Sequence, residues 1–274
     1  MRSIAVMNQK GGVGKTTTAV NLSAALAASG QRVCLVDLDP QAHASLHLGV
    51  SLRDGEPSVY DVLTGDLRLA DVRRTIDDRL SLVPAHLDLA AAEVELAGEV
   101  GREVILRDKL VQDFAQNGTQ FDYLLVDCPP SLGVLTINAL TMVREVFLPL
   151  QPHFLALHGL SKLLRTVEVV SKRLNPQLRL SGVLLCMYDA NTRLAAEVST
   201  DVSAYFAREQ TPDCIWSAAR AFQTRIRRNI RLAEAPSFGQ SIFQYAPTSN
   251  GAEDYRSLAE EVLAMATHEQ LAAA

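Results

Sequence analysis

Residues 7–18 read MNQKGGVGKTTT. They follow a short apolar run, residues 4–7, and precede an alanine- and leucine-rich segment with helical spacing, so the order predicts a strand, a glycine-rich turn and a helix N-terminus. Gly11, Gly12 and Gly14 allow the backbone to curl with successive N–H groups pointing inward. These groups, together with the positive end of the helix dipole, can hold a polyphosphate. The stretch therefore predicts a phosphate site.

The side chains of this loop suit a nucleotide bound with Mg²⁺. Lys15 offers a positive charge to the β and γ oxygens, and Thr16 offers a hydroxyl to Mg²⁺. The expected nucleotide-binding residues are Lys10, Gly11, Gly12, Val13, Gly14, Lys15, Thr16 and Thr17. The usual G-x-x-x-x-G-K-[ST] pattern is matched imperfectly, because Gln9 replaces its first glycine and Lys10 opens the loop.

The string KGGVGKT at residues 10–16 resembles the deviant Walker A loop of the ParA and MinD group of ATPases. In that group the first lysine crosses to the nucleotide of a partner subunit, so the resemblance implies ATP as ligand and a catalytic role for both Lys10 and Lys15. It also implies a homodimer that forms on ATP binding. The alternative is that Lys10 is an ordinary solvated loop lysine.

Two further strands are predicted to end in carboxylates. The apolar run 33–37 leads into Asp37-Leu38-Asp39-Pro40-Gln41, and carboxylates at this end of a parallel sheet lie where such sheets bind ligands. For Asp37 a purely structural role, capping the next turn, stays open. The string DLDPQ resembles the second signature of the ParA/Soj family, in which the later aspartate helps to position the attacking water. The resemblance thus assigns Asp39 to catalysis and to the surroundings of the metal.

Residues 121–130, FDYLLVDCPP, form the third landmark. An apolar strand ending in Asp127 matches a Walker B element, whose carboxylate holds Mg²⁺ through a water molecule. The two prolines that follow prevent the strand from continuing and predict a switch-like loop through residues 131–133.

The alternation of strands with helices of 10 to 20 residues predicts the fold class. Strands are expected at 80–84, 143–150 and 180–188, and helices at 16–29, 157–174 and 253–274. Residues 87–116 show helical patterning that is broken near Gly98 and Gly101. This order implies right-handed crossovers and an α/β fold of the P-loop NTPase type, a mainly parallel twisted sheet with helices on both faces. A length of 274 residues is compatible with one domain covering 1–274.

A cluster of arginines occupies residues 220–231, RAFQTRIRRNIR, inside a chain whose net charge is −5. Such a run is commonly just a solvated face. With residues 232–237 it resembles the Pro-Arg-Asn-Val-Arg-Leu-Ser-Glu-Ala-Pro segment of Soj-like proteins, whose arginine binds DNA and aligns with Arg228. Guanidinium groups that pair with phosphates give salt-sensitive binding without base specificity. The predicted contacts to non-specific double-stranded DNA are Arg193, Arg225, Arg227, Arg228 and Arg231.

Composition limits the other possibilities. The N-terminus shows no apolar leader, no window of about 18 residues is apolar throughout, and the C-terminal segment lacks the basic face of a membrane-binding helix. We therefore expect a cytoplasmic, nucleoid-associated protein that binds no membrane. The four cysteines lie far apart without a C-x-x-C pair, which favours core packing over an iron–sulfur cluster.

The resemblance implies a partitioning ATPase that forms an ATP-sandwich dimer, coats DNA and is released when a ParB-like partner stimulates slow hydrolysis. Three alternatives remain: the same ATPase positioning another cargo, a MinD-like membrane-bound division-site regulator, and a metabolic or metal-cluster enzyme such as a cobyrinate amidase.

Overall fold

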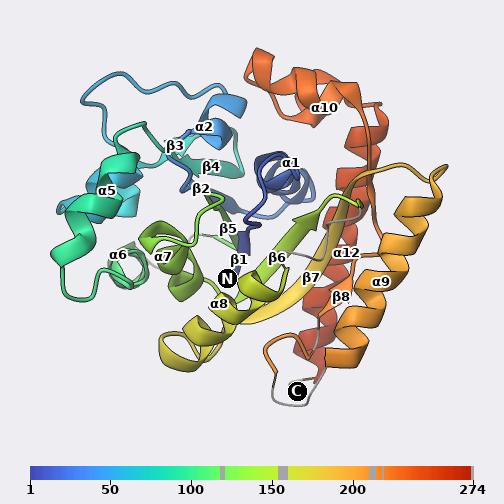
Figure 1. The fold of residues 1–274 in the computed structure, drawn as a ribbon. Helices are drawn as coiled ribbons and strands as arrows, with labels where there is room; N and C mark the ends of the chain where they lie inside the picture. Colours follow the sequence, from blue (N-terminus) through green and yellow to red (C-terminus); the bar gives the residue numbers. More distant parts are fainter. Residues whose placement is uncertain (118–120, 154–159, 210–213, 218, 273–274) are drawn as a thin grey trace.

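A twisted sheet forms the centre of the computed structural model, which describes residues 1–117, 121–153, 160–209, 214–217 and 219–272 (Figure 1). In these residues the strand order is β3-β4-β2-β5-β1-β6-β7-β8, with β9 also beside β7, and every pairing except β3 with β4 is parallel. The strands are β1 (Arg2–Val6), β2 (Val33–Asp37), β3 (Arg74–Thr75), β4 (Leu80–Val83), β5 (Tyr123–Asp127), β6 (Glu145–Leu150), β7 (Arg179–Tyr188), β8 (Arg220–Ala221) and β9 (Ile226–Arg227).

Helices cover both faces of the sheet because its central strands are apolar on both sides. Along β1, Ile4 and Val6 pack into one hydrophobic cluster and Ala5 into the other. The first cluster is closed by α1 (Lys15–Ala28) and α12 (Asn250–Ala272). The second is closed by α3 (Val59–Thr64), α4 (Leu69–Val72), α5 (Leu89–Glu95), α6 (Ile105–Asn117), α7 (Val134–Met142), α8 (Leu160–Arg173) and α9 (Arg193–Glu209). The remaining short helices are α2 (His43–His47), α10 (Ile230–Glu234) and α11 (Ile242–Tyr245).

Strand register brings the predicted ligand-binding residues together. Asp37 at the end of β2 is the register partner of Asp127 at the end of β5, and Val6 of β1 pairs with Asp127 from the other side. The glycine-rich loop leaves β1 at this level. One edge of the sheet therefore receives the loop and both carboxylate strands, as parallel strands require.

The predicted fold class is confirmed, with differences in individual elements. The break expected near Gly98 and Gly101 in the helical segment 87–116 is confirmed, because this segment consists of α5, a 3₁₀ turn at Leu96–Gly98 and α6. Residues 154–159, where the helix predicted for 157–174 would begin, lie outside the described residues, and α8 is described from Leu160. No pattern in the sequence reading predicted α7 or α9.

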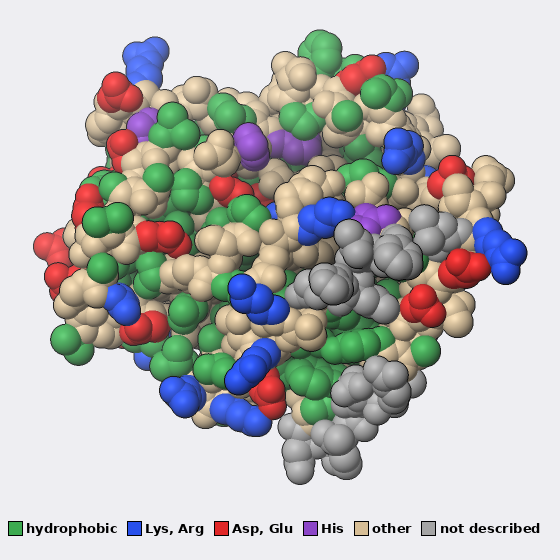
Figure 2. Space-filling model, viewed as in Figure 1, with side chains coloured by type: hydrophobic (Ala, Val, Ile, Leu, Met, Phe, Trp, Pro, Cys, Tyr) green, Lys and Arg blue, Asp and Glu red, His purple; other side chains and the backbone are tan. Residues whose placement is uncertain are grey.

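Charge is unevenly distributed on the face seen in Figure 2. Acidic side chains gather at the left, where Figure 1 places α5 and α6, whereas Lys and Arg side chains gather lower down, where Figure 1 places α8. Within the described ranges no helix is long and apolar enough to cross a membrane.

Gly182 on β7 offers a test of core packing. A Cβ at this position would lie 2.2 Å from Cε2 of Phe222, a buried ring that packs edge-on against Phe147 at a centroid distance of 4.9 Å. We expect Gly182→Ala to lower the free energy of unfolding by about 1–3 kcal/mol in urea titrations, because the ring must move within a filled core. Gly98→Ala is the control, since a Cβ there meets nothing within 4 Å. An equal effect of both substitutions would contradict this packing argument.

Candidate functional site

The glycine-rich loop leaves the N-terminus of α1 open for a ligand. Gly12 and Gly14 have φ angles of 71° and 93°, in the left-handed region that favours glycine. Gly14 is the N-cap of α1 and makes no side-chain cap hydrogen bond to the first turn. The first-turn N–H groups and the helix dipole together favour an anion.

Lys15 lies at the base of the loop and is 7% exposed. Its Nζ donates a hydrogen bond of 3.2 Å to the carbonyl of Lys10, which holds the side chain along the inside of the loop. Burial lowers the pKa of Lys15, and the charges of Asp127 and Asp39 oppose that shift in part. The ammonium group is therefore close to both carboxylates and poorly solvated, so it is well placed to receive a further anion.

Asp37 and Asp127 are equally buried but differ in their hydrogen bonds. Asp37 accepts hydrogen bonds from the N–H and the hydroxyl of Ser45, at 2.8 and 2.7 Å, and from the N–H of Asp39 at 3.2 Å. Burial still raises the pKa of Asp37 to about 6. These contacts hold α2 against the end of β2, so the structural alternative for Asp37 agrees with the geometry.

Asp127 has neither carboxylate oxygen hydrogen-bonded among the described residues. Burial raises its pKa well above the ordinary value, and the charges of Asp37 and Asp39 raise it further. The hydroxyl of Thr16, which lies close to the carboxylate without the geometry of a full hydrogen bond, and the charge of Lys15 act in the opposite direction. A fully buried carboxylate without a partner is rare in native proteins. Such a group fits the expectation that a ligand shell completes its bonding.

These residues fit a Mg²⁺ ion delivered with phosphates. Thr16 would offer a hydroxyl, Asp127 a carboxylate for a water bound to the ion, and Asp39 a second carboxylate, which is 8% exposed. The residues described contain no group of three His, Cys, Asp or Glu side chains able to hold a metal alone. A P-loop site does not require one, because oxygens of the phosphates and of water would supply the remaining ligands of the ion.

The side chain of Lys10 contacts a residue outside the loop. Its Nζ contacts Nε2 of His153, in the segment that follows β6, and its main-chain N–H donates to the side chain of Asn8. Neither contact involves an opposite charge. Burial, and next the adjacent Lys10 charge, lower the pKa of His153, which favours a neutral ring as the acceptor.

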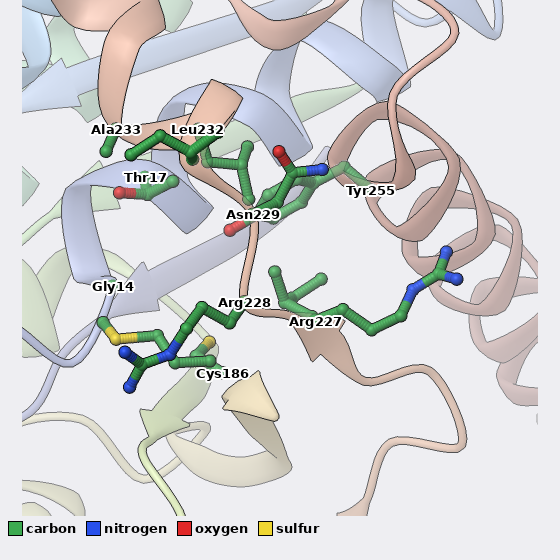
Figure 3. Close-up of a pocket in the computed structure, with 12 residues that line it drawn as sticks. Gly14, Thr17, Cys186, Arg227, Arg228, Asn229, Leu232, Ala233 and Tyr255 are labelled. Atoms are coloured by element: carbon green, nitrogen blue, oxygen red, sulfur yellow. The ribbon is translucent and has the colours of Figure 1, made fainter. Parts of the chain in front are cut away.

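A cavity of about 390 Å³ opens beside the loop and the start of α1 (Figure 3). Gly14 and Thr17 form one wall, and the opposite walls come from the ends of β7 and β9, from α10 and from α12. The side chain of Arg228 extends along the cavity on the side of Gly14 and Cys186, whereas that of Arg227 runs toward α12. The other lining residues are Met187, Ile226, Asn229, Ile230, Leu232, Ala233 and Tyr255.

The arginines predicted to bind DNA do not form one group. Arg193, Arg227 and Arg231 pair with carboxylates: Arg193 with Glu197 at 2.9 Å, Arg231 with Glu234 at 2.8 Å, and Arg227 with both Glu253 and Asp254 at 2.6 Å. Arg225 lies over the ring of Tyr188, 4.5 Å from its centroid, and donates to the hydroxyl of that tyrosine. Arg228 shows no acidic partner among the described residues and lines the cavity instead.

The sheet, the glycine loop and the carboxylates define the class of this protein as a P-loop nucleotide-binding α/β protein. A model of the AAA domain family matches residues 1–180. The chain is 48% identical to the sporulation initiation inhibitor protein Soj of Bacillus subtilis, covering 95% of this chain and 98% of that one. It is 47% identical to the chromosome-partitioning ATPase Soj of Thermus thermophilus, with 96% of each chain covered.

A solved structure of cobyrinic acid a,c-diamide synthase from Mycobacterium smegmatis, with a bound ATP analogue and magnesium, has a TM-score of 0.77 at 37% identity and covers 96% of this chain and 94% of that one. The chain belongs to the ParA/Soj family of partitioning ATPases, which confirms the resemblance seen in its motifs.

Sequence reasoning missed the cavity wall. Met187, Asn229 and Tyr255 are far apart in the chain, and only the placement of β7, β9 and α12 around α1 brings them to Thr17. One local signal existed: Asn229 belongs to the arginine-rich stretch, which was assigned to DNA alone.

The contrast between Asp127 and Asp37 gives a test. Without nucleotide, we expect Asp127→Ala to change the free energy of unfolding by less than about 1 kcal/mol, because it removes no full hydrogen bond. Asp37→Ala should lower the free energy of unfolding by about 2–4 kcal/mol, because it leaves three donors unpaired. Urea titrations measure both values. In wild type, ATP with Mg²⁺ should raise the melting temperature more than ATP alone does, and Asp127→Ala should lose this additional rise. Equal destabilisation by both substitutions would make Asp127 a structural residue.

Proposed function

We propose that this protein is a partitioning ATPase that dimerises around two ATP molecules, binds double-stranded DNA without sequence preference and leaves DNA after hydrolysis. The cofactors are ATP and Mg²⁺, and one ATPase domain spanning 1–274 carries the activity. A ParB-like partner would stimulate hydrolysis and link the cycle to a chromosome or plasmid. Support comes from the family relatives named for chromosome partitioning and from the ATP analogue and magnesium in the mycobacterial structure.

One observation carries this proposal: Asp127 is buried without a hydrogen bond beside Lys15, Thr16 and Asp39, at the mouth of an open glycine loop. A purely structural carboxylate would have partners, as Asp37 has. A bound Mg²⁺ ion would supply charge neutralisation for the phosphates and for the buried carboxylate. The site thus has the charges and donors that a nucleoside triphosphate requires.

The chain's own residues divide the work of hydrolysis. Lys15 and the N–H groups of the loop hold the phosphate oxygens and stabilise negative charge as it develops. Asp39 holds and orients the attacking water. One of its carboxylate oxygens accepts a hydrogen bond of 3.0 Å from the N–H of Gln41, which fixes the orientation of this side chain. Lys10 would reach the nucleotide of the partner subunit once it leaves His153.

The cavity beside α1 suits the nucleoside. It adjoins the loop, its volume of about 390 Å³ falls in the range for small-molecule sites, and its walls combine apolar side chains with Asn229 and Arg228. A base in this cavity would leave the triphosphate on the loop. Arg228 would then contact the nucleoside. Replacing Arg228 would therefore weaken DNA binding in part by weakening nucleotide binding.

DNA binding would draw on arginines whose present partners are weak. The exposed pair between Arg193 and Glu197 is an i,i+4 pair of the kind that contributes little stability, so phosphate could replace the carboxylate. Arg227 is held by two carboxylates, which makes it the least available of the five. Two patches joined in a dimer bind DNA more tightly than one through effective concentration.

A second candidate function is amide synthesis, because the protein named as a cobyrinic acid a,c-diamide synthase has the same fold and is 37% identical in sequence to this chain. An ATP-dependent amide synthase would form amide product from a carboxylic acid, a nitrogen donor and ATP. The partition relatives match at higher identity over as much of the chain, which favours partitioning. Another cargo, or a membrane-bound role, would use the same ATP site and differ in its partner.

Asp39→Ala tests the division of labour at the site. We expect the variant to bind ATP with an affinity within about threefold of wild type, to hydrolyse it at least about 100-fold more slowly, and to accumulate as an ATP-bound dimer, because water positioning is lost while phosphate binding remains. Single-turnover hydrolysis and light scattering measure these effects. A variant that stays monomeric with ATP would contradict the assignment.

Binding to random-sequence duplex DNA, measured with ATP, with ADP and without nucleotide across a salt series, tests the DNA proposal. We expect salt-sensitive binding with ATP only, and a loss of about tenfold for Arg193→Ala with a shallower salt slope. ATP affinity should stay unchanged in Arg193→Ala and fall in Arg228→Ala. Lys172→Ala is the matched control, since Lys172 pairs with Glu168 on α8. Equal binding in all nucleotide states would overturn the proposed coupling.

A further inference from the structure

A second hollow, of about 620 Å³, lies between α8, α7 and the segment before α6, and we call it the α8 groove. Its apolar lining comes from Ile137, Val169, Val170 and Leu174. Val169 is 45% exposed although it belongs to this apolar surface. The remaining lining residues are Glu103, Lys162, Arg165, Thr166 and Arg173.

Three positive charges surround the α8 groove without being neutralised. Lys162, Arg165 and Arg173 are exposed, and within the described residues none of them takes part in an ion pair. The one carboxylate in the lining, Glu103, is engaged with Arg102 at 3.2 Å. Three free cations at one site are unusual in a chain whose net charge is −5.

The cations and the exposed valine follow the geometry of α8. Lys162, Arg165, Val169 and Arg173 are spaced three, four and four residues apart, so they lie along one stripe of the helix. From Lys162 to Arg173 the stripe is roughly 16 Å long at the helical rise. Figure 2 shows Lys and Arg side chains next to apolar ones in the region where Figure 1 places α8.

We propose that the α8 groove binds an acidic amphipathic helix of a partner protein. An apolar stripe about three turns long in the partner would cover Ile137, Val169 and Leu174, and Asp or Glu residues beside that stripe would face the cations. Charge complementarity of this kind sets orientation and excludes basic partners.

Two other occupants fit less well. DNA would present phosphates to the cations but leave the apolar floor without a matching surface, and Glu103 would repel it. A second copy of this chain would have to offer an acidic apolar helix of its own. The inference does not depend on nucleotide chemistry, so it stands or falls separately from the proposed function.

Selection from a displayed library of 16-residue helical peptides tests the proposal. The bait is the full chain without nucleotide, and peptides that also bind the double variant Arg165→Glu/Arg173→Glu are removed by counter-selection. We expect enriched peptides with Leu or Ile at i, i+3 or i+4, and i+7, flanked by Asp or Glu. Fluorescence polarisation of one labelled enriched peptide should show a loss of affinity of about tenfold or more in the double variant and in Val169→Asp. Both altered surfaces are exposed, so thermal melting should remain unchanged.

Lys172→Glu is the matched control, because it reverses a charge on the same helix outside the groove. Its peptide affinity should stay within about twofold of wild type. The proposal is overturned if enriched peptides show no acidic bias or bind the double variant equally well. It is also overturned if random-sequence duplex DNA displaces the peptide, or if the protein self-associates in light scattering and Val169→Asp abolishes that association.

Discussion

Everything at the proposed nucleotide site depends on buried charge concentrated at one edge of a parallel sheet. The register of β2 and β5 places Asp37 directly opposite Asp127, and the loop after β1 brings Lys15 close to Asp127 and Asp39. Burial raises the pKa of both aspartates and lowers that of the lysine, so each charge alone is costly there. A ligand that carries phosphate and divalent metal together compensates charges of both signs at once.

The two aspartates show how one environment supports two roles. Ser45 binds Asp37 through its N–H and its hydroxyl, and the same hydroxyl accepts from the N–H of Ala85, so this carboxylate joins α2 to the segment after β4. In the part of the chain that the structure describes, Asp127 has no such network, and Pro129 and Pro130 follow it closely in the sequence. The difference lies in the neighbours, since residue type, burial and position at a strand end are the same.

Local sequence predicted the parts of this site that are local in the chain. The loop and the carboxylates each follow an apolar run, so strand, turn and ligand-binding residue could be assigned together, and the placement of β1, β2 and β5 agrees. Contacts between distant segments could not be predicted. Arg227 finds Glu253 and Asp254 only because β9 lies against α12, and Arg228 reaches the cavity because β9 extends beside β7. A charge cluster in the sequence thus separated into arginines with different partners.

A short segment connects the metal site at the end of β5 to α7, a helix that lines the α8 groove. Only residues 128–133 lie between Asp127 and α7. Thr136 of α7 donates to the carbonyl of Ser131 at 2.7 Å, so this loop and the helix are hydrogen-bonded to each other. A Cβ at Gly133 would lie 1.9 Å from Oε1 of Glu93 on α5, so the end of that exposed side chain would have to move away from the loop. Ile137, one turn further along α7, lines the groove. A shift of the loop on loss of the γ-phosphate would therefore move a groove wall, and an occupant of the groove would in turn favour one position of the loop.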